Sequence, residues 1–323
     1  MPSPTTTLAQ LRPDLRTFYE SAYESAQMDF VGPQIFPVMA VPKQTGKFGK
    51  IAIEDLLRHS QAGARSPGSG YWRDIQQFTE DSFATSEYGF EELIDDREAQ
   101  MYSDYFDAEV LATQRATNKL LTRQEMRCAA LFDSTAYTSA SMVQALGNGA
   151  WDTAASTPIT DVENAVQKVY LATGEKPNTL IINWVTYRKL KLVTQIISAI
   201  ESAGAGFARR AADVTREMLS AVFDLNVVVA GGSKNTANPG AAAVIAQIWP
   251  KHAIIAKVAT TNDMREPCVG RQFHWTDDGS EFSGQVETYR QEDVRSDVVR
   301  VRHDVQEKRL YLEMACMILN VTS

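Results

Sequence analysis

Few residues of this chain fall at spacings that support cofactor binding. Gly231 and Gly232 follow an expected strand, but they do not complete the G-x-G-x-x-G pattern that brings a backbone close to a dinucleotide. The run from Thr173 to Pro177 (TGEKP) likewise lacks the spacing of a phosphate-binding loop. The sequence therefore predicts no nucleotide cofactor, and indeed no cofactor of any kind.

Metal-ligating and catalytic patterns are also missing. No C-x-x-C or H-x-x-x-H spacing places two ligands on one turn. Acidic pairs such as Glu91 and Glu92 are adjacent in sequence, so their side chains point in different directions and do not predict a catalytic dyad. No G-x-S-x-G elbow marks a nucleophile. The four histidines fall in separate expected elements: His59, His252, His274 and His303. We expect no metal site and no catalytic site, and we predict that the chain is not an enzyme.

Composition limits the remaining classes. The 323 residues are 44% hydrophobic, enough for a sizeable core, and the net charge of −8 argues against strong binding to nucleic acid. No apolar run is long enough to cross a membrane, and the N-terminus does not resemble a signal peptide, so we expect a protein that stays in the cytoplasm. Cys128, Cys268 and Cys316 lie far apart among apolar residues, which indicates reduced, packed thiols.

The first half of the chain predicts several extended or elongated parts. Leu11 to Asp29 has the apolar spacing of an amphipathic helix, docked either on its own domain or on a neighbouring subunit. Gln34 to Val41 predicts an edge strand or connector because it contains proline, and Lys47 to Ile53 predicts a further strand. Arg58 to Gly70 is too poor in apolar residues to pack, which leaves an intermolecular loop or a linker as alternatives.

One long helix is expected next. Asp95 to Asp133 contains no Pro or Gly and has apolar residues at helical spacing. At a rise of about 1.5 Å per residue, an unbroken helix here would reach roughly 50 to 60 Å. That is longer than the core of a single domain needs, so the helix is expected to brace an elongated part of the molecule.

The second half predicts a mixed α/β unit followed by strands. The expected elements of the unit are a helix at Val162 to Thr173 ended by Gly174, a strand at Asn178 to Asn183, helices at Thr186 to Ile200 and Val214 to Phe223, a strand at Val227 to Ala230, and a hairpin joining Ala242 to Ile248 with Ile254 to Val258. Val269 to Thr322 is strand throughout in pattern, including an alternation from Leu310 to Met314. Arg300 and Arg302 alternate with valines and indicate a solvated face.

This order of parts resembles the major capsid proteins of tailed phages with the Hong Kong 97 type of fold, an α+β fold. The most specific stretches are Lys176 to Leu190 (KPNTLIINWVTYRKL), Asp213 to Phe223 (DVTREMLSAVF) followed by Asn226 to Val229, and Gln272 to Trp275 (QFHW) ahead of Tyr289 to Asp293 (YRQED). The resemblance runs from about Gln34 to the end of the chain. It implies these parts: an N-terminal arm at 1–33, peripheral-domain strands and an extended loop at 34–94, a spine helix at 95–135, an axial domain at 136–268, and a peripheral-domain sheet at 269–323.

The resemblance also implies a function and partners. Copies of the chain would form hexamers and pentamers of an icosahedral shell around double-stranded DNA, located in the virion and assembled in the host cytoplasm without a membrane. Portal and decoration proteins are implied, and a separate scaffold, or none, is expected because only about thirty residues precede the fold. Some members cross-link subunits through a lysine and an asparagine, but no motif here identifies such residues.

Two hypotheses concern surfaces. A ring of like subunits needs contacts between different patches, and the extended loop is the expected source of such contacts. The residues expected to meet a neighbouring subunit are Phe18, Tyr19, Arg65, Tyr71, Trp72, Arg73 and Phe78. The acidic net charge suggests an inner wall that repels packed DNA.

Two alternatives remain. One is a nanocompartment shell that encloses cargo enzymes, and the other is an α/β enzyme in which Gly63 to Gly70 forms a lid.

Overall fold

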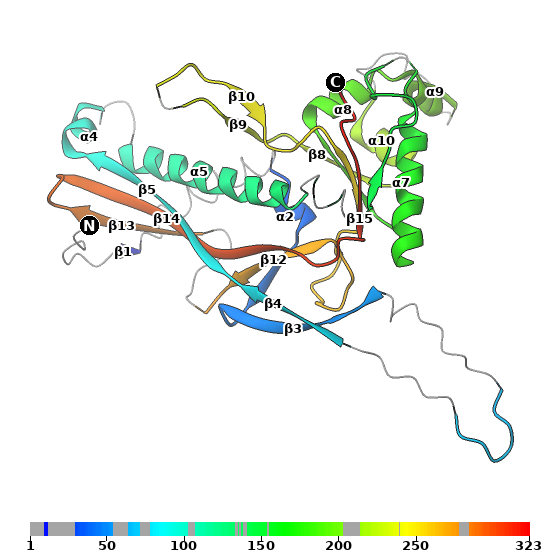
Figure 1. Cartoon of the computed structure of the whole chain (residues 1–323). Helices are drawn as coiled ribbons and strands as arrows, with labels where there is room; N and C mark the ends of the chain where they lie inside the picture. The colour runs from blue at the N-terminus through cyan, green and yellow to red at the C-terminus, as the bar shows by residue number, and fades with distance from the viewer. Residues whose placement is uncertain are drawn as a thin grey trace.

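The structure is a computed structural model that describes residues 10–11, 30–53, 64–71, 78–102, 107–132, 135, 137, 141–153, 155–202, 214–238, 240–277 and 284–323. Two sheets organise these residues (Figure 1). The helix α5 (Ala108–Ala130) lies along the first sheet and ends beside the second. No helix in these ranges is long and apolar enough to cross a membrane.

The first sheet, called here the β14 sheet, is built around one long strand. Its path is β1-β13-β14-β12-β2, and β5 pairs with β14 as well. The strands are β1 (Gln10–Leu11), β2 (Val38–Val41), β5 (Ser86–Asp95), β12 (Gly270–Trp275), β13 (Gln285–Gln291) and β14 (Ser296–Arg309). The alternation in β14 was predicted: Val299 and Val301 are buried against α5, while Arg300 and Arg302 lie on the opposite side.

The second sheet, called here the β11 sheet, has the order β6-β15-β11-β7-β8. Its strands are β6 (Val143–Gln144), β7 (Thr179–Asn183), β8 (Asn226–Ala230), β11 (Ala253–Ala256) and β15 (Ala315–Ile318). The helices packed around it are α7 (Pro158–Thr173), α8 (Trp184–Leu190), α9 (Thr194–Ser202) and α10 (Arg216–Phe223). The main hydrophobic core surrounds this sheet, whose β7, β11 and β15 strands are buried throughout.

Several elements of the β11 sheet region match their predictions. α7 ends at Gly174, which adopts the left-handed conformation with φ of 71°. β7, β8 and α10 also form within a residue or two of the expected limits. The predicted helix from Thr186 to Ile200 is wrong as one element, because the chain turns between α8 and α9 at Lys191 and Leu192.

The predicted long helix over Asp95 to Asp133 is also wrong as a single element. α4 (Asp96–Tyr102) is separate from α5, and the Asp107 side chain accepts hydrogen bonds from the backbone N–H of Glu109 (3.0 Å) and of Val110 (3.4 Å). An aspartate in this position begins a new helix. α5 alone is about 35 Å long at a rise of about 1.5 Å per residue.

Three predictions for the second half are wrong, two of them because strands pair with partners other than the expected ones. β10 (Ile245–Gln247) pairs with β9 (Ser233–Asn235), and β11 pairs with β7 and β15, so the hairpin expected between 242 and 258 does not form. The segment 310–314 is not a strand. β15 belongs to the β11 sheet, so residues 269–323 do not complete one sheet.

The elements predicted for the first half of the chain are partly confirmed. β2 is an edge strand of the β14 sheet, parallel to β12, and β3 (Thr45–Ile51) matches the strand expected at 47–53. α2 (Gly32–Ile35) precedes β2 and was not expected. Leu11 lies in β1, which pairs with β13, so the predicted helix does not begin there, and residues 12–29 lie outside the described part.

Candidate inter-subunit contact site

An antiparallel hairpin carries the extended loop. β3 pairs with β4 (Phe78–Ala84) in a regular register from Thr45 opposite Ala84 to Ile51 opposite Phe78. Residues 64–71, called here the loop tip, belong to the segment between these strands and lie far from both sheets (Figure 1). An element that reaches so far from its own core is placed to contact another molecule.

The hairpin is fixed to the β14 sheet by aromatic packing. The Phe83 ring stacks on that of Phe273 with centroids 4.9 Å apart, and the Phe48 ring lies 5.7 Å from Phe273. These rings belong to a third hydrophobic cluster, which also contains Val41 and Leu310. Aromatic pairs at such distances stabilise a contact beyond the area they bury, so the base of the loop has a defined direction.

Polar contacts hold the same junction. The Lys308 ammonium donates to the Asp81 carboxylate and the Ser82 carbonyl, and the Ala84 N–H donates to Gln306 Oε1 (2.8 Å). Partial burial raises the pKa of Asp81, but the hydrogen bonds from Lys308 and the Ser82 N–H, together with the charges of Lys308 and Lys50, outweigh burial and lower this pKa. Lys50 lies on the Tyr311 ring, 4.2 Å from its centroid, and burial lowers its pKa.

The loop tip has its own local structure. The Ser69 N–H donates to the Ser66 carbonyl (3.1 Å), and Pro67 and Gly68 occupy the centre of that turn, with Gly68 at φ of 87°. Proline followed by glycine with positive φ is the chemistry of a type II turn. The Arg65 guanidinium lies 4.9 Å from the Tyr71 ring centroid and donates from Nε to the Ser69 carbonyl (2.6 Å).

The tip is nevertheless exposed. All of its residues are exposed, and Tyr71 retains 76% of its accessible surface. Arginine and tyrosine are both enriched at energetically important positions of protein interfaces, and here the two side chains are stacked at an exposed turn. The geometry suits a contact with a second molecule.

The sequence-predicted contact residues divide into three groups. Arg65 and Tyr71 lie together at the loop tip. Phe78 opens β4, far from the tip, with its backbone paired to Ile51. Phe18, Tyr19, Trp72 and Arg73 lie outside the described residues.

A buried polar cluster, called here the α5 joint, consists of Glu125, Arg127, Trp249, His303 and Glu307. Glu125 accepts hydrogen bonds from the N–H groups of Val31 (3.0 Å) and Gly32 (2.8 Å) and from Trp249 Nε1 (2.5 Å). Burial raises the pKa of Glu125 despite these three donors. This carboxyl connects α5 to the segment before β2 and to the segment before β11.

The other half of the α5 joint faces the β14 sheet. Arg127 donates to both oxygens of Glu307 (2.9 and 2.8 Å), and its guanidinium lies 3.7 Å from the Tyr88 ring centroid. His303 Nε2 is 3.5 Å from the same guanidinium. Burial, together with the charge of Arg127, lowers the pKa of His303 to about 3, so the ring is neutral at ordinary pH.

Sequence analysis missed the α5 joint, although one signal was present. Glu125 lies at helical spacing from Leu121 and Cys128, two buried positions of α5, where a carboxylate requires partners. Its partners come from residues about one hundred positions away, and no periodicity indicates them. Within the described ranges, which do not include His59, no three His, Cys, Asp or Glu side chains form a group suited to a metal ion.

The three cysteines are buried and free, as predicted. Burial raises the pKa of each thiol. They are packed, unreactive side chains.

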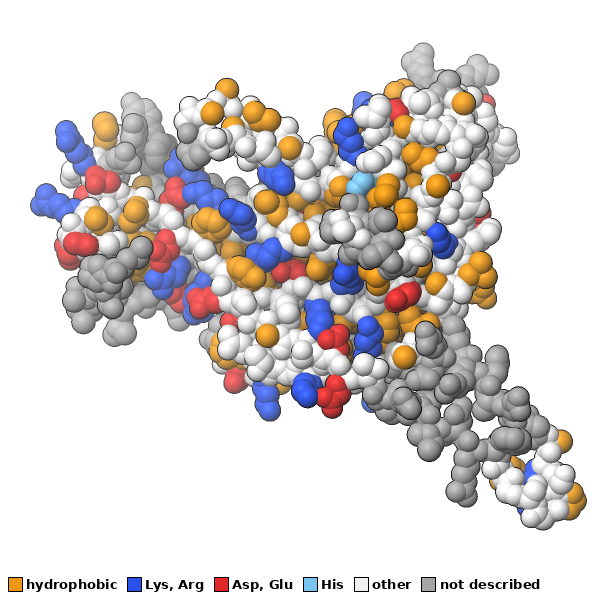
Figure 2. All heavy atoms as spheres, in the orientation of Figure 1, with side chains coloured by type: hydrophobic (Ala, Val, Ile, Leu, Met, Phe, Trp, Pro, Cys, Tyr) orange, Lys and Arg blue, Asp and Glu red, His pale blue; other side chains and the backbone are white. Residues whose placement is uncertain are grey.

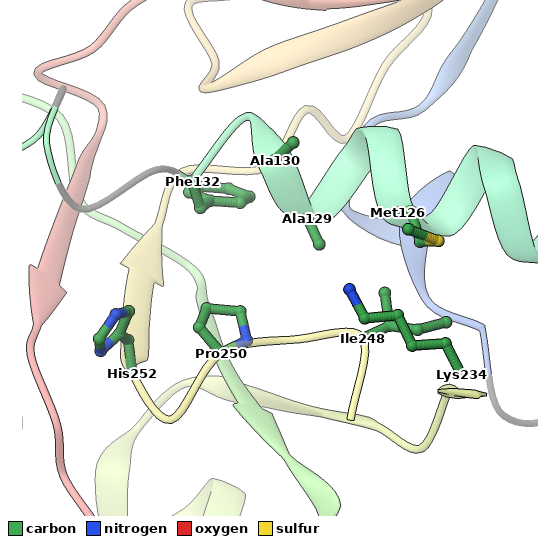
Figure 3. Close-up of a pocket in the computed structure, with 8 residues that line it drawn as sticks. All are labelled: Met126, Ala129, Ala130, Phe132, Lys234, Ile248, Pro250 and His252. Atoms are coloured by element: carbon green, nitrogen blue, oxygen red, sulfur yellow. The ribbon is translucent and has the colours of Figure 1, made fainter. Parts of the chain in front are cut away.

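A cavity of about 590 Å³ lies between the C-terminal end of α5, β9 and the segment that follows β10 (Figure 3). Met126, Ala129 and Phe132 line one side, and Lys234 and Ile248 line the other. The lining is mostly apolar and brings together no nucleophile and base. It does not support the lid-bearing enzyme considered above.

No family model matches the chain. Among curated proteins, the major capsid protein of Burkholderia phage BcepMu is 26% identical over 204 residues, which cover 63% of this chain and 64% of that protein. The chain thus aligns with slightly less than two thirds of the length of this relative.

Solved structures match over nearly the whole chain. A phage-related protein from Bordetella bronchiseptica RB50 has 19% identity and a TM-score of 0.69 over 98% of both chains. The capsid of cyanophage P-SCSP1u has 13% identity and a TM-score of 0.58 over 88% of this chain and 86% of that one. A virus-like particle from Pyrococcus furiosus has 13% identity and a TM-score of 0.54 over 94% and 98%. The chain has the fold of phage capsid proteins, and the expected α+β fold of the Hong Kong 97 type is confirmed.

Proposed function

We propose that this chain is the major capsid protein of a tailed phage, a structural subunit and not an enzyme. The observation that carries the proposal is the phage capsid fold over almost the full chain, together with sequence similarity to a phage major capsid protein. The extended loop supports it, because a hairpin fixed at its base and exposed at its tip suits contacts between copies.

In the finer proposal, copies form hexamers and pentamers that close into an icosahedral shell around double-stranded DNA. The shell assembles in the host cytoplasm and becomes the capsid of the virion. A separate scaffold, a portal and decoration proteins are the proposed partners. The β11 sheet and its helices would form most of the axial domain, and the β14 sheet the peripheral domain with α5 as its spine.

Within such a shell, the loop tip would rest on a neighbouring subunit through Tyr71 and Arg65. Trp72, Arg73 and Phe78, which follow in sequence, remain proposed contacts, as do Phe18 and Tyr19 of the N-terminal arm. Ordering the loop costs conformational entropy, which the contact would offset upon assembly.

The alternative of a cargo-holding compartment uses the same architecture. The name of the curated relative favours the phage capsid over it.

The test is electron microscopy of the purified recombinant chain, with sedimentation velocity on the same sample. Closed icosahedral particles or six-membered rings are the expected result. A chain that stays monomeric at high concentration, with or without its scaffold, would refute the proposal. Uniform shells that enclose one copurifying enzyme would instead favour the cargo compartment.

A further inference from the structure

The exposed side of α5 carries a line of positive charge. Arg115, Lys119, Arg123 and Arg127 follow one another at four-residue steps, so they lie along the same side of the helix. Lysine and arginine side chains gather along this helix in Figure 2. Asn118 and Thr122 between them are uncharged, and the only acidic residues of α5 are Glu109 at its start and the buried Glu125. The chain as a whole has a net charge of −8, so this line differs in sign from the average.

The ion pairs on this side leave the cation outermost. Lys119 binds Glu92 at 2.7 Å and Arg115 binds it at 3.6 Å, but the Arg115 side chain is 59% exposed and that of Glu92 only 19%. Arg127 covers the nearly buried Glu307 in the same way. Arg123 is exposed as well. The carboxylates partly neutralise the local charge but lie beneath the cations. A molecule that approaches α5 from solvent therefore meets guanidinium and ammonium groups first.

The opposite side of the β14 sheet has the reverse arrangement. Arg302 pairs with Glu87, and there the carboxylate is the exposed partner, at 59% against 20% for the arginine. Arg300 pairs with Glu91, which is again the more exposed of the two, although both arginines also pair with Glu287, whose side chain is only 11% exposed. The far side of the β14 sheet therefore presents both charges, whereas the α5 side presents mainly cations.

The β9–β10 region extends the cationic side. Lys234 from β9 faces the C-terminal part of α5 across the cavity of Figure 3. A second cavity of about 470 Å³ on the other flank of α5 is lined by Arg123 and Arg127. Residues 225–262 contain no Asp or Glu at all. No carboxylate from this region interrupts the positive surface beside the helix.

We propose that the α5 side, made by Arg115, Lys119, Arg123 and Lys234, contacts the phosphate backbone of the duplex DNA enclosed in the shell. The inference rests on the proposed capsid function and adds which side of the subunit faces the genome. The cations follow one another about 6 Å apart along the helix, whereas a duplex carries one negative charge per roughly 1.7 Å of its axis. Because the phosphates are so closely spaced, the cations can contact them in any register. An acidic protein would instead need carboxylates at matching positions. The contact is electrostatic and independent of base sequence.

This proposal revises the hypothesis that the inner wall repels DNA. The net negative charge belongs to the chain as a whole, while the α5 side is locally attractive. A few exposed cations per subunit give weak, salt-sensitive contacts that position DNA without holding it tightly.

The test compares two triple variants of the full chain in binding a fluorescent duplex of about 30 base pairs, at roughly 20 to 200 mM salt. Arg115→Gln, Lys119→Gln and Arg123→Gln remove the line on α5. Lys43→Gln, Lys176→Gln and Arg265→Gln remove the same charge from exposed positions elsewhere. The α5 variant is expected to bind at least about tenfold more weakly, and its slope of log K against log salt to fall by about 2.7, at 0.9 per lost phosphate contact. The control is expected to bind within about twofold of the unmodified chain.

Equal weakening in both variants, or no binding by the unmodified chain at low salt, would overturn the proposal. Tighter binding of polyglutamate than of DNA, through the same three residues, would assign the surface to an acidic protein instead. Electron microscopy of the same preparations separates the two proposals. Shells without α5-dependent DNA binding refute this inference alone, whereas α5-dependent DNA binding without any shells refutes the capsid function.

Discussion

At the α5 joint, buried charges find their partners within the chain, whereas at the loop tip a cation and an aromatic ring are left in solvent. Glu125 accepts three hydrogen bonds, and Arg127 is bound to both oxygens of Glu307. Among the described residues, Arg65 and Tyr71 contact each other and their own turn. The joint therefore supports the folded subunit, and the tip is available for a contact that the subunit alone does not make. Substitutions at the α5 joint should reduce the stability of the subunit, and substitutions at the loop tip should affect assembly.

The largest loss of stability is expected for Arg127→Leu. This change leaves the Glu307 carboxylate buried without its partner, and breaking a buried ion pair on one side costs about 3–5 kcal/mol. Urea denaturation of the purified chain measures the free energy of unfolding. Adding Glu307→Gln should recover part of the loss, and a double variant no more stable than Arg127→Leu would contradict the pairing.

A second effect concerns the loss of stability at acidic pH. The pKa of His303 in the folded chain is about 3, below its ordinary value of 6.5, so the unfolded chain binds the proton more readily. The contribution of the neutral ring to the free energy of unfolding is therefore fully present above pH 6.5. This contribution is lost as the pH falls, by about 1.4 kcal/mol per pH unit. The free energy of unfolding should fall between pH 7 and pH 5 in both proteins. In His303→Gln this fall should be smaller than in the unmodified chain by about 2 kcal/mol. Parallel curves for the two proteins would rule out His303 as the source.

A smaller effect is expected for Trp249→Phe, which removes one of the three donors to Glu125 and keeps the two backbone N–H groups. The expected cost is about 1–2 kcal/mol in the free energy of unfolding. Trp184→Phe is the matched control, because that indole is half exposed, and a change within about 0.5 kcal/mol is expected there. Equal effects of the two substitutions would show that the hydrogen bond to Glu125 contributes nothing.

The smallest effect on stability, within about 0.5 kcal/mol, is expected for Tyr71→Ala. Shell formation should nevertheless require a higher protein concentration, measured by light scattering and electron microscopy. Tyr71→Phe keeps the ring beside Arg65 and should assemble normally. If Tyr71→Ala assembles at the same protein concentration as the unmodified chain, the loop tip is not an assembly contact. The contrast between the loop tip and the α5 joint would then be wrong for the loop tip.

The predictions that succeeded from sequence depend on neighbours a few residues apart. The alternation of Val299 and Val301 with Arg300, the buried strand β7 and the end of α7 at Gly174 all follow from local periodicity or backbone preference. The predictions that failed concern partners. Residues 242–258 contain two strands, but their partners lie at 233–235, 179–181 and 315–318. The helix over 95–133 failed locally, since its apolar spacing continued past the point where Asp107 begins a new helix.

For the candidate site, the sequence predicted an extended loop, because residues 58–70 are too poor in apolar residues to join a core. Of the contact residues predicted with it, Arg65 and Tyr71 lie together at the described loop tip. It did not identify the α5 joint, where Glu125 meets Trp249 from 124 positions away.

By itself, the sequence determined the types of most elements, the buried face of β14, the exposure of the loop tip and a net charge of −8. Tertiary structure alone decided which strands pair, which buried carboxyl receives which donors, and on which side the charge lies. Net charge gives no direction, whereas the packing of α5 on the β14 sheet turns Arg115, Lys119 and Arg123 outward on one side and exposes Glu87 and Glu91 on the other. The physical reason is range: periodicity acts over a turn or a strand, whereas ion pairs and sheets join residues brought together only by the complete fold.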